Sequence, residues 1–185
     1  MRTHNDSGVS VAELLVTISI LMVVLSMVYY ATEAIQISAE VSDRQSQYAQ
    51  EIANPMHGMD KVLSANKAIE NSGGFTSDAY RLTTRTTVIE GSNAFQRYVY
   101  SANADGTLTE DVYRQALGSA TSTLLRSRVW TTNNANQEKG PLFTYLAADG
   151  TQTTPNAAQS VLVKIWIRNG DEYFNGERQI YFRNR

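Results

Sequence analysis

The apolar residues of this chain follow three successive patterns. A continuous apolar run extends from Val9 to Tyr30 and holds one charged residue, Glu13. The next segment is polar, with apolar residues at helical spacing, and after Phe75 the spacing changes to the alternation of β-strands. This order predicts a long helix followed by a β-rich region, an α+β fold with helix on one side of an antiparallel sheet.

The first run has the length of a membrane span. A helix from Val9 to Tyr30 reaches about 33 Å at about 1.5 Å per residue, and a hydrocarbon core is about 30 Å thick. A carboxylate near the middle of such a span costs about 2.5–3.5 kcal/mol, and somewhat less near its end. Glu13 therefore predicts a functional group within a membrane helix.

The helical pattern continues past the apolar run as one stripe on a polar background. We expect a single helix from about Val9 to about Asn66, with Gly73-Gly74 ending the helical region. Pro55 predicts a kink, or a fresh helix capped by Asn54, and the unbroken phase of the stripe favours the kink. The stripe consists of Ile35, Val41, Tyr48, Ile52, Met56, Met59 and Leu63.

The remaining chain predicts antiparallel strands joined by turns. The clearest alternation is in Val161–Arg168, and the pairs Asp105-Gly106 and Asp149-Gly150 are typical of tight turns. Polar loops are expected at Asn133–Lys139 and Thr151–Gln159. The other expected strands are Tyr80–Glu90, Phe95–Tyr100, Leu108–Tyr113, Leu124–Trp130, Leu142–Leu146 and Gln179–Arg183.

The amino-acid composition excludes several kinds of functional site. The chain has 185 residues, a net charge of −2, no Cys and 2 His. The absence of Cys excludes disulfides, zinc-thiolate sites and cysteine nucleophiles, and the weak net charge gives no global signal for nucleic acid. We expect no catalytic residue, no cofactor and no metal ion.

The N-terminal residues resemble a processing signal. Gly8 follows a short polar segment and precedes Val9-Ser10-Val11-Ala12-Glu13-Leu14-Leu15-Val16. This pattern resembles the leader and first helix of type IV prepilins and pseudopilins, in which Glu is the fifth residue after the cleavage site. Val9 departs from the family, which usually has Phe there.

The β-rich region extends this resemblance over most of the chain. An aromatic strand (Tyr98, Tyr100) precedes the Asp105-Gly106 turn, and the segments LLRSRVW, PLFTYLAADG and VLVKIWI follow in order. In this order they resemble the J-type minor pseudopilin of type II secretion and related minor pilins of type IV pili. The resemblance implies a pilin fold, in which the long helix packs on the β-rich head.

The resemblance also implies a non-enzymatic assembly subunit. Prepilin peptidase would cleave after Gly8 and methylate the amine of Val9, and Glu13 would pair with the terminal amine of a neighbouring subunit, which offsets the desolvation of both charges. The expected segments are a leader (1–8), a membrane and assembly stem (9–30), an amphipathic continuation of the helix (31–74) and a β-rich head (75–185).

The resemblance further implies a location and partners. The subunit would cross the inner membrane once, with an extracytoplasmic head, and would reach a filament or the cell surface after assembly. Its expected partners are other major and minor pilins or pseudopilins, the peptidase, the inner-membrane assembly platform, and membrane lipid before assembly. Its role would be to help initiate or cap a type IV pilus or a type II secretion pseudopilus.

Several alternatives stay open. The chain could be a membrane-anchored binding module that never polymerises. An enzyme could use Glu51, His57 and Asp60, which lie near one another on the predicted helix. A calcium site could draw on loop oxygens, and a DNA-uptake pilin could bind nucleic acid through a basic patch. The calcium candidates are Asn103, Asp105, Asp149, Asp171 and Glu172; the basic candidates are Arg126, Arg128, Arg178, Arg183 and Arg185.

Overall fold

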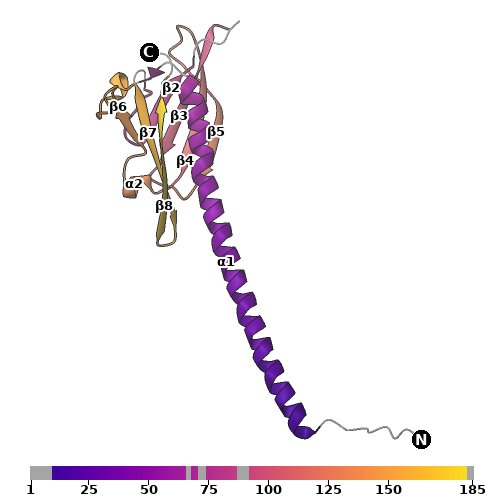
Figure 1. Cartoon of the computed structure of the whole chain (residues 1–185). Helices are drawn as coiled ribbons and strands as arrows, with labels where there is room; N and C mark the ends of the chain where they lie inside the picture. Colours follow the sequence, from indigo (N-terminus) through magenta and orange to yellow (C-terminus); the bar gives the residue numbers. More distant parts are fainter. Residues whose placement is uncertain (1–9, 66–67, 71–73, 87–91, 183–185) are drawn as a thin grey trace, which may run out of the picture. The chain divides into compact units, whose positions relative to one another are not determined.

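The computed structural model describes residues 10–65, 68–70, 74–86 and 92–182. It divides the chain into two compact units, residues 1–46 and 47–185. The helix α1 runs from Val11 to Ala65 and passes through Pro55 without a break (Figure 1). The predicted single long helix is therefore confirmed over this range.

The first unit contains the apolar part of α1. Among the described residues, α1 is the one helix that is long and apolar enough to cross a membrane, and none of its most apolar window is buried. Every described side chain from Ser10 to Ser46 is exposed. Up to Tyr30, this surface is far more apolar than that of an ordinary soluble helix, as in a helix that could cross a membrane.

The second unit holds two antiparallel sheets; the alternating patterns predicted antiparallel strands but not their division into two sheets. Three strands of the first sheet, β3 to β5, form successive antiparallel neighbours, and β7 is the central strand of the second sheet (Figure 1). The first sheet contains β1 (Ala68–Ile69), β2 (Arg81–Arg85), β3 (Ala94–Ala102), β4 (Leu108–Ala116) and β5 (Thr123–Thr131); the second contains β6 (Phe143–Leu146), β7 (Ser160–Asn169) and β8 (Glu172–Tyr181).

The later turns of α1 supply one side of the core of the second unit. Met59 and Leu63 are fully buried, and Met56 is nearly so. They join one cluster with the inward residues of both sheets, including Tyr100 and Phe143. The alternation predicted for β7 is confirmed, because Val161, Val163, Ile165 and Ile167 are all fully buried.

Two glycines let α1 approach both sheets closely. A Cβ atom at Gly58 of α1 would lie 2.8 Å from the Trp130 ring of β5, and a Cβ atom at Gly176 of β8 would lie 2.6 Å from Ile52 of α1. Beside Gly176, the rings of Tyr48 and Phe174 stack with centroids 4.7 Å apart. Because glycine has no side chain, Gly58 and Gly176 are the positions at which the helix can approach β5 and β8 closely.

The structure corrects the expected extent of the helix. The segment 31–74 is not helical throughout, because α1 ends at Ala65 and β1 follows at Ala68–Ile69. Within the second unit, the stripe residues from Tyr48 onward belong to the core cluster or pack against it, whereas Ile35 and Val41 of the first unit are 69% and 49% exposed. Helical spacing alone does not reveal how much of a stripe has a partner surface.

A second correction concerns the expected loop at Asn133–Lys139. Asn136–Lys139 form a short helix, α2, and both Asn134 and Asn136 are buried. The Asn136 amide donates to the carbonyl oxygens of Gly140 and Lys164, at 3.1 and 2.7 Å. These asparagines connect the segment to β7 by hydrogen bonds. A polar stretch of sequence does not show whether its side chains bind inside the protein or face solvent.

The expected loop at Thr151–Gln159 also includes a 3-10 turn, η1 (Pro155–Ala157).

Candidate functional site

Glu13 lies in the first turn of α1 and takes part in a capping box with Ser10. The Ser10 backbone N–H donates to the Glu13 carboxylate at 2.9 Å, and the Glu13 backbone N–H donates to the Ser10 hydroxyl oxygen at 3.2 Å. This reciprocal pair satisfies two backbone donors that a helix N-terminus leaves free. The carboxylate also lies at the positive end of the helix dipole, which stabilises its charge.

The capping box gives Glu13 a local role beside the predicted one. The spacing of Ser10 and Glu13 is the S-x-x-E pattern of a helix start, so this role was readable from the sequence but was missed there. Gly8 and Val9 lie outside the described residues, so the predicted cleavage and methylation remain predictions. Pairing of Glu13 with a neighbouring chain likewise remains a prediction.

The Ser and Thr hydroxyl groups in the interior of the apolar run are satisfied within the helix. Thr17, Ser19 and Ser26 each donate to the backbone carbonyl four residues earlier, at 2.7 to 2.9 Å, and Thr32, just past the run, does the same. Such bonds remove the cost of placing a hydroxyl in hydrocarbon. The Ser and Thr side chains of the run are therefore compatible with an apolar surrounding, and Glu13 is its one carboxylate.

The end of the apolar run carries two aromatic side chains. Tyr29 and Tyr30 are 66% and 68% exposed, and their rings meet edge to face with centroids 5.9 Å apart. Tyrosines of this kind are typical of the boundary between hydrocarbon and water. Their position agrees with a span that begins near Ser10 and ends near residue 30.

The residues considered for an enzyme make structural contacts in the second unit. Glu51 accepts a hydrogen bond from the Thr131 hydroxyl at 3.0 Å, and Asp60 forms an ion pair with Arg178 at 2.8 Å. His57 is exposed. These contacts join α1 to β5 and β8, and they give each carboxylate a structural partner.

The Asp-Gly pairs considered for calcium form matching turns. The Asp105 carboxylate accepts from the Thr107 hydroxyl at 2.7 Å and from its backbone N–H at 3.0 Å. Asp149 accepts from Thr151 in the same way, at 2.7 and 2.9 Å. These hydrogen bonds hold the pKa of both carboxyl groups below the usual value. The bond from the threonine hydroxyl has the largest effect, and the bond from the backbone N–H comes next.

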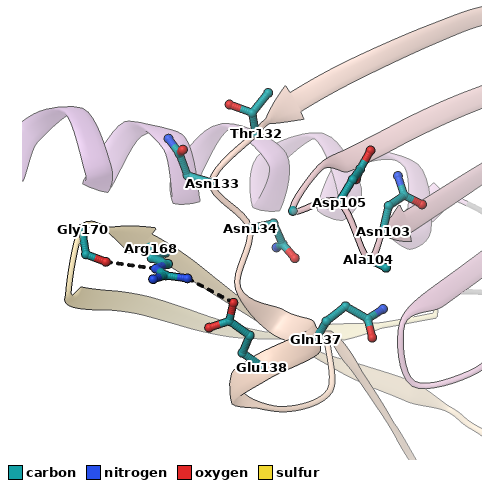
Figure 2. A pocket seen from close by; sticks show the side chains of 11 residues that line it. Asn103, Ala104, Asp105, Thr132, Asn133, Asn134, Gln137, Glu138, Arg168 and Gly170 are labelled. Carbon is teal, nitrogen blue, oxygen red and sulfur yellow. Dashed lines mark hydrogen bonds and ion pairs between the residues drawn. The ribbon is translucent and has the colours of Figure 1, made fainter.

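A polar hollow of about 420 Å³ lies beside the first of these turns (Figure 2). On its far side, Arg168 donates to the Gly170 carbonyl at 3.0 Å and to the Glu138 carboxylate at 3.3 Å, as the dashed lines of Figure 2 show. Within the described parts of the chain, no group of three or more His, Asp or Glu side chains is arranged to hold a metal ion.

The arginines considered for nucleic acid are dispersed and partly neutralised. Arg126 pairs with Glu110, and Arg178 pairs with Asp60. The Arg128 guanidinium stacks over the Trp130 ring, 3.6 Å from its centroid. Arg183 and Arg185 lie outside the described residues. The described arginines thus present no continuous basic stripe for a phosphate backbone.

Comparison of the chain with protein-family models, with curated proteins and with solved structures finds no match.

Proposed function

We propose that this chain is a minor pilin or pseudopilin, a non-enzymatic subunit that is cleaved after Gly8, methylated at Val9 and packed through its stem into a short filament. One observation carries this proposal: the exposed apolar run at the start of α1 holds a single carboxylate, Glu13, which is hydrogen-bonded in the first turn of the helix. A membrane anchor needs the apolar surface and could use Glu13 to cap its helix, but it has no need of a charge that pairs with a neighbouring chain.

The pilin fold belongs to the same proposal. A long N-terminal apolar helix continues into a unit with antiparallel sheets, and its later turns pack on those sheets. This arrangement supports a subunit whose helix serves two purposes: the first part mediates assembly and the later part anchors the head. The head would lie outside the inner membrane and contact other subunits at the start or the tip of the filament.

Glu13 is the group that would recognise a neighbour. In a cleaved subunit the amine of Val9 is cationic and begins the same helix. An opposite charge a few ångströms away offsets the desolvation of both groups in a medium of low dielectric constant. Axially staggered stems would bring Glu13 of one subunit to the amine of the next, while their apolar surfaces cover each other.

The capping box favours one competing function, the anchored module that never polymerises. In that case Glu13 only completes its own helix terminus. Glu13→Gln separates the two roles, because glutamine retains the capping geometry at this position and loses the charge.

We expect Glu13→Gln to be processed normally but to fall by at least about tenfold in the assembled fraction, because an amine buried without its counter-ion is strongly unfavourable. The measurement compares the variant in membranes and in sheared or extracted filaments of the native host. Ser10→Ala is the matched control: it weakens the cap, retains the carboxylate and should assemble. Normal incorporation of Glu13→Gln would contradict charge pairing and support the anchor.

A further inference from the structure

A groove of about 460 Å³ opens in the second unit between the end of α1 and the inner face of the first sheet. Its α1 wall is apolar around Val62, and its sheet side comes from three successive strands. The residues that matter here are Lys61 and Val62 of α1, Tyr98 of β3, Glu110 of β4, and Arg128 and Trp130 of β5.

Glu110 forms a buried and satisfied part of this groove. Its side chain is 4% exposed and forms an ion pair with Arg126, which is 58% exposed. A buried carboxylate is tolerated only with such a partner. Glu110 and Arg126 therefore neutralise each other, and neither supplies net charge to an occupant.

The charged side chains that remain in the groove, Lys61 and Arg128, are both cationic donors. Among the described residues, neither Lys61 nor Arg128 has an ion-pair partner. The Arg128 guanidinium carbon lies over the Trp130 ring, 3.6 Å from its centroid. This cation–π contact restrains the guanidinium and leaves N–H groups available for a carboxylate.

Trp130 adds a further unmatched donor. Its indole N–H is buried and has no acceptor within the described parts of the chain. A buried donor without a partner is unfavourable and is rare in native structures. This N–H is enclosed by the protein and does not face the groove directly, whereas the two cations without an ion-pair partner among the described residues, Lys61 and Arg128, border it. An anionic occupant would complement these two cations.

The surroundings favour a protein over a nucleic acid as the source of that anion. The chain has a net charge of −2, and Arg126 and Arg178 are already paired, so no extended basic stripe tracks a phosphate backbone. Val62, Tyr98 and Trp130 instead supply apolar surface next to the cations. A carboxylate flanked by apolar side chains matches this combination.

We propose that this groove binds an acidic segment of a partner protein, with a Glu or Asp carboxylate on Arg128 and Lys61 and a neighbouring apolar side chain against Val62 and Trp130. This surface lies wholly within the second unit and is separate from the stem. It is therefore a contact beyond stem packing.

The test uses the full chain in detergent micelles, in a Trp166→Phe background, so that Trp130 is the one remaining tryptophan. The probe is a capped hexapeptide of alternating leucine and glutamate, and its glutamine counterpart is the neutral control. We expect saturable, salt-sensitive binding of the acidic peptide, followed by Trp130 fluorescence. Arg128→Gln should weaken it by about tenfold or more.

Matched variants separate binding from folding. Lys61→Gln lies on an exposed helix position and should weaken binding without lowering the melting temperature, and Arg168→Gln on β7 should leave binding unchanged. Glu13→Gln should also leave it unchanged, so a failure of stem assembly and a failure of this groove are distinguishable. Four results would each overturn the assignment: equal binding of both peptides, no binding at about millimolar concentration, tighter binding of an oligothymidine, or occupation of the groove by a second copy of this chain.

Discussion

At the scale of single residues, three carboxylates acquire their roles from hydrogen bonds made within a few residues of themselves. Asp105 and Asp149 each bind the threonine two positions later, and the following glycines, Gly106 and Gly150, have φ of 82° and 81°. The Asp-Gly pairs predicted these turns because glycine adopts positive φ at little cost. Glu13 similarly binds Ser10.

The Asp105 and Asp149 turns give a prediction about pH. Because hydrogen bonds lower the pKa of both folded carboxyl groups below the unfolded value of 3.8, their contribution to stability is present above pH 3.8 and is lost as the pH falls through the folded pKa. Thr107→Val removes the largest cause at Asp105, so its pKa should rise toward 3.8. Carboxyl carbon NMR titration measures both groups, with Asp149 as the internal control. An unchanged Asp105 pKa in the variant would show that the Thr107 hydroxyl is not the cause.

At the scale of elements, the sequence predicted the existence of the long helix α1 well, but it did not predict which residues of the helix are buried. The apolar run and the stripe predicted one long helix, because both follow from local periodicity. The same periodicity did not predict that Ile35 and Val41 would stay exposed while Met59 and Leu63 would be buried. Burial depends on which side chains join the core of the second unit, and tertiary packing decides this rather than local periodicity.

The difference along the stripe is testable by truncation. Met59→Ala removes a fully buried side chain and should lower the free energy of unfolding of the second unit by about 2–5 kcal/mol. Ile35→Ala changes a side chain that is 69% exposed and should change it by less than about 0.5 kcal/mol. Chemical unfolding followed by near-ultraviolet circular dichroism measures both variants. Equal losses would contradict the burial pattern of α1.

At the scale of the whole molecule, the sequence predicted a long helix followed by antiparallel strands, but it did not predict the groove in the second unit. The strands β2 to β7 were predicted at least in part, but β1 was missed, and so was most of β8, which begins at Glu172 and not at the expected Gln179. The helix α2 was missed because the polar residues of its segment are buried by contacts with β7. Glu13 was found because a charge in an apolar run is conspicuous. The groove was not, because Lys61, Tyr98, Glu110 and Arg128 come from four elements that only tertiary packing brings together.

The central claim is that the first helix is an assembly device released by processing. Intact-mass analysis of the chain purified from the membranes of its native host tests this claim most directly. The account predicts a chain that begins at Val9 and carries one methyl group on its terminal amine, and a Gly8→Leu variant that keeps the leader. A wild-type chain that retains residues 1–8 and an unmodified helix start would contradict it and would leave a membrane anchor.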